Sequence, residues 1–350
     1  MIDVRFLIPG DLATPTGGYA YARRLLADLA AHGVDATAVP LPGSFPHPTP
    51  GDLAATQIAI AGTPQDAVLL VDGLAYGALP PKVVACAGSR PIVALVHHPL
   101  GLEAGLGADD ALRLVASERM ALALATRVVV TSRFTRSLLV AEFGVPAGRI
   151  SVAEPGTDPA PRATGGGSRR VSLLAVGAVT PRKGFDLLVQ ALATLTDLDW
   201  HLTIAGACDR SPDHVAALRR TIASDGLGGW ITLAGAVSPD RLAELYDRAD
   251  IMVSASLFEG YGMALAEALA HGLPVVATTG GAAAETVPDG ACLKVAPGDA
   301  TALAAALRLM VGDPEHRRAT ADAAWAAGQA LPRWRDTAAI VAATLKDAQA

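Results

Sequence analysis

Two adjacent cations in the second half of the chain follow the end of an apolar run. The run Val171–Val176 is followed by Gly177, and Arg182 and Lys183 lie in the loop just before Gly184. Apolar residues at helical spacing come next, so we expect the cations beside a helix N-terminus, which favours an anion such as a diphosphate. Such a pair is usually solvated surface. However, only four of the 28 basic residues are lysines, and a lysine kept here favours the anion site.

Two glutamates form a second candidate site. Glu259 precedes a helical pattern and Glu267 lies on it, within the segment Ser254–Glu267, SASLFEGYGMALAE. At ~1.5 Å per helical residue they are up to ~12 Å apart, too far to act as a pair on one bond. They suit two separate hydroxyl-bearing groups of one extended ligand. Glu267 lies among Leu265 and Ala268 on an apolar helix, so it needs a partner, because a buried unpaired carboxylate is costly.

A glycine turn near the start of the chain is a third candidate. Gly17 and Gly18 end the segment PGDLATPTGG, between the first apolar run and a helical pattern. Glycines there let backbone amides approach an anionic ligand closely. A plain turn explains the feature equally well. The spacing departs from the dinucleotide fingerprint G-x-G-x-x-G, so it gives little support to a nicotinamide site.

A histidine pair, His97 and His98, follows the strand-like run Pro91–Val96. Ligands of open α/β sheets bind at such strand ends. A histidine is more often structural than a ligand, so at this point both interpretations stay open, as does the choice between the two residues.

All these candidates lie at the ends of strand-like runs that alternate with helical patterns. Parallel strands need crossovers of about a dozen residues, so this alternation predicts an α/β fold of two Rossmann-like, doubly wound parallel sheets. The length, 350 residues at ~150 per domain, also indicates about two domains. The expected strands are Asp3–Ile8, Val34–Val39, Val68–Val71, Pro91–Val96, Arg127–Val130, Val171–Val176, Trp200–Ala205, Trp230–Ala234, Ile251–Ser254 and Pro274–Ala277.

A glycine-rich linker at 159–170 separates the two halves. We expect a first domain at 1–165, a second at 166–331, and a closing helix at 332–350 that crosses back to the first domain. Helix starts are expected where Ser132 can cap a helix and where Ser238 precedes Pro239.

Composition excludes several classes of protein. With 28 basic and 34 acidic residues, a net charge of −6 and 18% charged residues, the chain is neither a basic nucleic-acid binder nor a disordered polyanion. Cys86, Cys208 and Cys292 have no metal-site spacing and are expected to be buried small apolar residues. Asp3 and Arg5 interrupt the first apolar run, unlike a signal peptide, so we expect a cytoplasmic location. No charge-free run is long enough to span a membrane, and peripheral membrane contact is left open.

The three sites together resemble one family. The glycine turn, the pattern G-x-x-x-x-R-K-G-x-x-x-L, and E-x7-E followed by HGLPVVAT are similar to the retaining glycosyltransferases of family 4, which have the GT-B fold. The resemblance extends to PGTDP at 155–159, the family's interdomain turn, to GGAAAETVPDG at 280–290, a late loop, and to 332–334, the start of its returning helix. The E-x7-E block is specific, whereas the glycine turn is weaker evidence.

The resemblance implies a role for each candidate and an interdomain cleft that holds the donor. Arg182 and Lys183 would bind the donor diphosphate, Glu267 the ribose hydroxyls and Glu259 the transferred sugar. His97 fits the family's histidine better than His98. GACDRSP at 206–212 departs from the family's glycine-rich turn. The implied catalytic set is Arg182, Lys183, Glu259, His97 and His98, and the implied donor-binding set is Gly17, Gly18, Gly177, Gly235, Val237, Gly260, Tyr261, Gly262, Met263 and Glu267.

The implied reaction moves a sugar from a UDP- or GDP-linked donor, with retention, to an unidentified glycan, lipid or small-molecule acceptor. The acceptor surface is expected from the loops 40–50 and 100–110. Fixed cations would stabilise the leaving diphosphate, so no metal or cofactor is expected. The D-x-D motif at Asp197–Asp199 suits a surface turn better than a metal site. A nucleotide-sugar epimerase of related fold and a non-catalytic sugar-nucleotide binding protein stay open, and the sequence does not indicate an oligomeric state.

Overall fold

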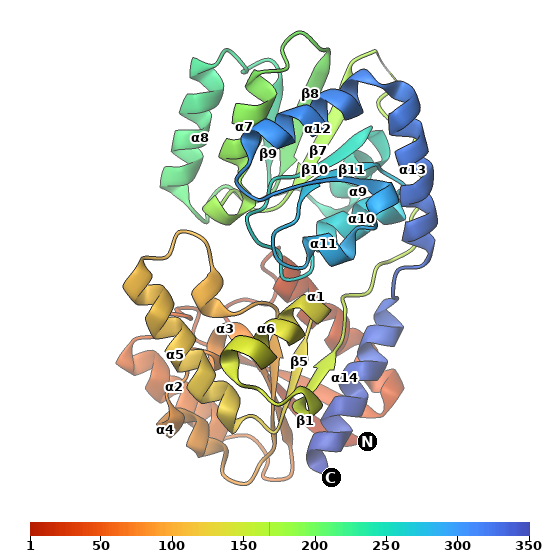
Figure 1. The fold of residues 1–350 in the computed structure, drawn as a ribbon. Helices are drawn as coiled ribbons and strands as arrows, with labels where there is room; N and C mark the ends of the chain where they lie inside the picture. Colours follow the sequence, from red (N-terminus) through yellow and green to blue (C-terminus); the bar gives the residue numbers. More distant parts are fainter. Residues whose placement is uncertain (168) are drawn as a thin grey trace. The chain divides into compact units, whose positions relative to one another are not determined.

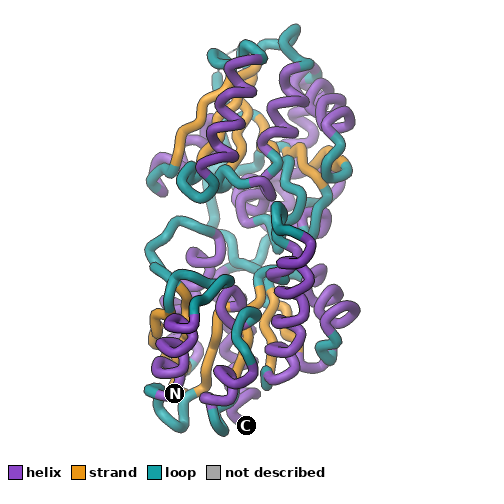
Figure 2. Tube along the Cα trace, turned by 90° about the vertical axis from the view of Figure 1, so that its left-hand side faces the viewer, coloured by secondary structure: helices purple, strands orange, loops and turns teal. Residues whose placement is uncertain are grey.

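The computed structural model describes residues 1–167 and 169–350, so the predicted linker is described except for residue 168. Contacts divide the chain into two units, Met1–Gly156 with Pro332–Ala350, and Thr157–Leu331. Each unit contains a six-stranded sheet covered by helices (Figure 1). Within each unit the strands form an inner layer, orange among purple helices in Figure 2. The predicted fold class, two Rossmann-like parallel sheets, is confirmed.

The sheet of the first unit has the strand order β2-β1-β3-β4-β5-β6, with parallel neighbours. Every residue of its central strands β3 and β4 is buried, and all but Asp72 are apolar, as expected for strands covered on both faces. The strands are β1 (Ile2–Pro9), β2 (Val34–Leu41), β3 (Val68–Asp72), β4 (Ile92–Val96), β5 (Arg127–Val130) and β6 (Ile150–Val152). The helices are α1 (Gly17–Asp28), α2 (Pro50–Ala61), α3 (Gly73–Tyr76), α4 (Pro81–Val84), α5 (Ala108–Leu124), α6 (Arg133–Phe143) and α14 (Trp334–Gln349).

The last helix, α14, packs on the first unit. Its apolar side, which includes Trp334 and Leu345, is buried. The Thr344 hydroxyl donates to Ser151 Oγ at 2.8 Å, and the Lys346 ammonium donates to the His32 carbonyl at 2.7 Å. Helix α14 therefore belongs to the same compact unit as β1–β6 although it is the last element of the chain.

The sheet of the second unit has the order β12-β11-β10-β7-β8-β9, again parallel. The strand order reverses beside β7, and ligands of such sheets bind at the carboxyl ends near that point. The strands are β7 (Val171–Val176), β8 (Trp200–Ala205), β9 (Ile231–Gly235), β10 (Ile251–Ser254), β11 (Val275–Thr278) and β12 (Cys292–Val295). The helices are α7 (Phe185–Ala193), α8 (Pro212–Ser224), α9 (Pro239–Arg248), α10 (Met263–Ala270), α11 (Ala283–Thr286), α12 (Ala300–Gly312) and α13 (Pro314–Gln329).

The second unit begins earlier than the predicted domain boundary after residue 165. Residues 157–165 group with the second unit. Their backbone explains why: the Ala163 amide donates to the His271 carbonyl at 2.8 Å, and the Thr164 amide donates to the Asp247 carbonyl at 3.0 Å.

The predicted helix starts are confirmed. Ser132 Oγ accepts the Thr135 amide at the start of α6, and Ser238 Oγ accepts the Arg241 amide at the start of α9, after which Pro239 occupies the first turn.

The expectation that all three cysteines are buried is wrong for two of them. Cys292 is buried, but Cys86 and Cys208 are only partly so. No helix in the described part of the chain combines the length and hydropathy that crossing a bilayer requires.

Candidate functional site

The loop after β7 brings the two cations against the segment that follows β10. A short 3-10 turn, η5 (Pro181–Lys183), carries both cations, and Gly184 joins it to α7 in a left-handed conformation with φ 61°. A Cβ at Gly184 would lie 2.2 Å from the Ala255 carbonyl oxygen, so only glycine permits this approach. The Leu257 amide donates to the Arg182 carbonyl at 2.8 Å, which joins the two segments.

Glu259 is the centre of a buried ion cluster. Lys183 Nζ donates to Glu259 Oε1 at 2.6 Å, and Arg182 Nη1 lies 3.4 Å from Glu259 Oε2 and donates to the Phe258 carbonyl at 2.7 Å. Ser256 Oγ also donates to Glu259 Oε1, at 2.6 Å. Burial alone would raise the pKa of Glu259, but the charges of Lys183 and Arg182 outweigh it and hold the pKa at about 2. Two cations thus face one carboxylate, which leaves an excess positive charge.

The cations stay within reach of solvent. The side chains of Arg182 and Lys183 are 20% and 15% exposed. The stem of Lys183 lies over Gly177, where a Cβ would come within 2.7 Å of Lys183 Cε. Gly177 in turn lies against Gly206, whose Cβ would be 1.9 Å from the Gly177 carbonyl oxygen. These glycines leave the space in which the lysine reaches Glu259.

The late loop at 280–290 holds the backbone of Glu259. The Glu259 amide donates to the Gly280 carbonyl at 3.1 Å, and the Ala282 amide donates to the Glu259 carbonyl at 2.8 Å. Gly281 has φ +64°, and a Cβ there would be 2.3 Å from the Glu259 carbonyl oxygen. The glycine pair of this loop was the only sequence signal for the contact, and the sequence did not indicate its partner.

Glu267, on α10, has the partner that its apolar surroundings require. The Tyr246 hydroxyl, from α9, donates to Glu267 Oε2 at 2.8 Å. Burial raises the pKa of Glu267, the Tyr246 hydrogen bond opposes that rise, and the charge of Asp158 adds to it. The sequence predicted that a partner exists but not that it is Tyr246, because the two residues come from different helices.

The predicted amide-bearing segment 260–263 leads into α10, which begins at Met263. Gly262, with φ +98°, precedes the helix. The Tyr261 carbonyl accepts the Thr286 hydroxyl, and the Tyr261 side chain is buried. Gly260 and Met263 flank this turn, so backbone amides of a helix N-terminus lie close in sequence to Glu259.

Gly235 is the last residue of β9 and Val237 follows it, at the same end of the sheet as Gly177. The Gly206 amide donates to the Gly235 carbonyl at 2.8 Å, and the Gly177 amide donates to the Ala205 carbonyl at 2.9 Å. Val237 is partly buried against the core near Tyr246. The structure therefore gathers these residues of the second unit at the carboxyl ends of its strands.

In the first unit, Gly17 and Gly18 form the first turn of α1, whereas a loop ahead of the helix was predicted. Thr16 caps the helix by accepting the Tyr19 amide, which starts it earlier than the apolar spacing indicated. A Cβ at Gly18 would lie 3.5 Å from Nε2 and Cδ2 of His97. The glycine turn and His97 are therefore neighbours within this unit.

The two histidines have different surroundings. His97 Nε2 lies 3.7 Å from Asp72 Oδ2, and the ring meets Tyr21 edge-on with centroids 5.3 Å apart. His98 Nε2 lies 3.0 Å from Glu103 Oε2. His97 thus packs against Gly18 and the aromatic core, whereas His98 interacts with the loop after β4.

The D-x-D motif is engaged in surface ion pairs. Arg308 binds both oxygens of Asp197 at 2.6 and 3.0 Å, and Arg170 lies 3.5 Å from Asp199. Across residues 1–167 and 169–350, no group of three His, Cys, Asp or Glu side chains could hold a metal ion.

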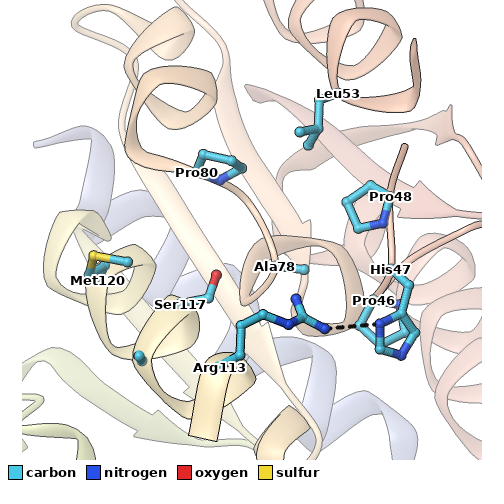
Figure 3. A pocket seen from close by; sticks show the side chains of 10 residues that line it. Pro46, His47, Pro48, Leu53, Ala78, Pro80, Arg113, Ser117 and Met120 are labelled. Carbon is cyan, nitrogen blue, oxygen red and sulfur yellow. Dashed lines mark hydrogen bonds between the residues drawn. The ribbon is translucent and has the colours of Figure 1, made fainter. Parts of the chain in front are cut away.

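A pocket of about 520 Å³ lies elsewhere in the first unit (Figure 3). Its walls include Pro46, Pro48 and Met120, and Arg113 Nη2 lies 3.2 Å from His47 Nδ1 at its side (Figure 3). Residues of the loop 40–50 line this pocket, and none of the predicted catalytic or donor-binding residues does.

Comparison with known proteins agrees with the resemblance. A family model described as Glycosyltransferase Family 4 matches residues 15–161, and one described as Glycosyl transferases group 1 matches residues 170–313.

Two relatives illustrate the likeness in sequence. The chain is 32% identical, over 71% of its length and 68% of the relative's, to the GDP-mannose-dependent alpha-(1-6)-phosphatidylinositol monomannoside mannosyltransferase of Mycolicibacterium smegmatis. It is 31% identical, over 62% of its length and 54% of the relative's, to the D-inositol 3-phosphate glycosyltransferase of an Arthrobacter species. The match thus spans about half to two thirds of these relatives' lengths.

Solved structures share the fold. Sucrose-phosphate synthase from Thermosynechococcus elongatus has a TM-score of 0.80 and 23% identity over 97% of this chain and 96% of that chain. Anabaena Alr3699/HepE in complex with UDP-glucose has a TM-score of 0.80 and 19% identity over 99% of this chain and 100% of that chain. The chain therefore belongs to glycosyltransferase family 4, the group 1 glycosyl transferases, enzymes that use nucleotide-sugar donors, and it has their GT-B fold.

Proposed function

We propose that this glycosyltransferase moves a hexosyl group from a UDP- or GDP-linked donor to an acceptor hydroxyl, with retention and without a metal ion. The observation that carries the proposal is the cluster of Arg182 and Lys183 on Glu259. Its excess positive charge lies beside backbone amides at the carboxyl ends of a parallel sheet, where this class of fold binds ligands.

The cations have a direct task in this reaction. The bond between the anomeric carbon and the phosphate oxygen breaks, and negative charge grows on the leaving diphosphate. Arg182 and Lys183 stabilise that charge more in the transition state than in the ground state, which lowers the barrier. The acceptor oxygen attacks the same face of the sugar, and its proton passes to the leaving phosphate, so the balance needs no further reactant.

The glutamates have separate tasks. Glu259 is charged at neutral pH, because its pKa is held at about 2, and its oxygens can accept hydroxyls of the transferred sugar. Glu267, on α10, accepts the ribose hydroxyls of the nucleotide. In the first unit, His97 is the residue proposed to contact the donor sugar, and Gly18 lies beside its ring.

Names of relatives indicate which ligands to test first. One is named as a GDP-mannose-dependent phosphatidylinositol monomannoside mannosyltransferase, and others are named for D-inositol 3-phosphate. HepE has been solved with UDP-glucose. GDP-mannose and UDP-sugars are therefore the first donors, and inositol-containing compounds the first acceptors.

The test is turnover with chemically defined donors. The protein is incubated with UDP- and GDP-sugars, with and without acceptors, and nucleoside diphosphate release and products are analysed. Acceptor-dependent release with a new glycoside supports the proposal. A changed sugar nucleotide formed from donor alone identifies an epimerase instead, and tight binding without turnover of any donor identifies a binding protein.

A further inference from the structure

Tyr246 is a buried residue outside every motif that predicted the site. Its side chain is 2% exposed, and its hydroxyl lies 2.8 Å from Glu267 Oε2 and 3.3 Å from the Ala264 carbonyl oxygen. The carboxylate is the closer acceptor and, when charged, the stronger one. The phenol therefore donates to Glu267.

The ring of Tyr246 is itself fixed in place. It stacks on His271 with centroids 5.1 Å apart and planes 11° apart. His271 Nδ1 lies 3.1 Å from the Pro161 carbonyl oxygen, and because a carbonyl only accepts, Nδ1 carries the proton there. The chain of contacts from Pro161 to His271, Tyr246 and Glu267 leaves the phenol little freedom to turn away from the carboxyl group.

The phenol donates to one oxygen of Glu267, Oε2, and leaves Oε1 open to a ligand. Among the described residues, hydrogen-bond donors reach only Oε2 of this carboxyl group. The Tyr246 hydrogen bond also opposes the rise in the pKa of Glu267 that burial causes, so it favours the charged form. A charged carboxylate with one oxygen fixed and one open is suited to accept hydroxyl donors.

We propose that Tyr246 is a positioning residue that holds Glu267 so that its open oxygen accepts the ribose hydroxyls of the donor nucleotide. The inference rests on the proposed role of Glu267 as the ribose ligand. Tyr246 itself contacts no substrate and acts through the carboxyl group.

A structural role for Tyr246 gives a different expectation. If the phenol only joined α9 to α10, its loss would weaken the binding of every nucleotide equally. The informative quantity is therefore the ratio of affinities for a nucleoside diphosphate and its 2′,3′-dideoxy counterpart, since only the ribose hydroxyls differ.

The experiment is titration calorimetry with UDP, GDP and their 2′,3′-dideoxy forms. We expect the unaltered protein to prefer the ribose form roughly tenfold or more, as one hydrogen bond to a charged group gives. Tyr246→Phe should lower this preference at least about threefold and leave the dideoxy affinity unchanged. In Glu267→Gln the preference should be smaller, and adding Tyr246→Phe to that variant should change it no further.

Tyr76→Phe is the matched control. It also removes a buried phenol hydroxyl, one that donates to the Ala121 carbonyl in the first unit, and it should keep the full preference. Tyr246→Leu, which lacks the hydroxyl as well, gives the same ratio test as a second variant.

Two results would overturn the inference, and they are distinguishable. If Glu267→Gln loses the ribose preference and Tyr246→Phe keeps it, Tyr246 is structural and the proposed role of Glu267 stands. If Glu267→Gln keeps the preference, the ribose assignment itself fails and the inference fails with it.

Discussion

Lys183 Nζ and Ser256 Oγ both donate to the same oxygen of Glu259, each at 2.6 Å. Two donors on one oxygen fix the carboxylate and also hold the lysine at the loop after β7. Because Arg182 engages the other oxygen, side chains of the protein itself orient both oxygens of this carboxylate. A site whose charges are already oriented loses little free energy to reorganisation when a diphosphate binds or leaves.

The two glutamates should separate binding from turnover. Glu267→Ala should weaken the binding of free UDP or GDP, because it removes the proposed acceptor for the ribose hydroxyls. Glu259→Ala should spare nucleotide affinity, because the cations remain, and should abolish most turnover. Calorimetry and product assays on both variants check this division, and an equal loss of nucleotide affinity would contradict it.

Glu118, on α5, should make the stability of the first unit depend on pH. It is buried and accepts the Leu100 amide at 2.8 Å, and burial raises its pKa from 4.5 to about 8. Below pH 4.5 both the folded and unfolded forms are protonated. Between pH 4.5 and 8 only the folded form keeps the proton, so the free energy of unfolding falls as pH rises.

Glu118→Gln should remove this fall, because glutamine stays neutral and still accepts the Leu100 amide. From pH 4.5 to 7 the variant should gain on the order of 3 kcal/mol relative to the parent. Urea unfolding at several pH values measures it, with Glu142→Gln on the exposed end of α6 as control. Parallel pH profiles for parent and Glu118→Gln would show that Glu118 is ionised in the folded protein.

Gly206→Ala should damage the cation loop by steric overlap. The added Cβ would lie 1.9 Å from the Gly177 carbonyl oxygen, so the loop that carries Lys183 must shift. We expect a loss of stability of about 1–3 kcal/mol and at least about tenfold weaker diphosphate binding. Gly229→Ala, where nothing lies within 4 Å of the new atom, is the control. If Gly206→Ala binds the diphosphate as well as the parent does, Gly206 does not support the diphosphate site.

Transfer should persist in excess chelator and should retain configuration. In the proposed mechanism, protein cations take the place of a divalent ion at the leaving group, so removing metal should change little. An α-linked donor should give an α-linked product, which proton NMR of the first-formed glycoside shows. A β product would indicate an inverting attack, with His97 as the base to examine. Loss of activity that Mg²⁺ or Mn²⁺ restores would exclude the role given to Arg182 and Lys183.

Local patterns in the sequence predicted most of the fold. Strands β7, β8 and β10 occupy the predicted residues, because short, mainly apolar runs between loops identify parallel strands. Strands β6 and β12 were not predicted: β6 has three residues, and β12 is partly exposed at a sheet edge, so neither gives a strong apolar run.

The site was predictable where its chemistry is local in sequence. Adjacent cations and the E-x7-E spacing indicated Arg182, Lys183, Glu259 and Glu267 as candidates, and the structure joins the first three in one ion cluster. The partners Ser256 and Tyr246 were not predicted, because a single serine or tyrosine gives no signal until the fold brings it to a carboxylate.

Binding of a nucleoside diphosphate by Lys183→Ala tests the central claim most directly. Calorimetry with UDP and GDP, in chelator, is carried out on the parent, on Lys183→Ala, and on Lys82→Ala as a control at an exposed lysine of α4. We predict that the parent and Lys82→Ala bind alike, and that Lys183→Ala binds roughly 10- to 100-fold more weakly, as loss of a charge-assisted hydrogen bond gives. Equal affinity of Lys183→Ala and the parent would contradict the assignment of this cluster to the donor diphosphate.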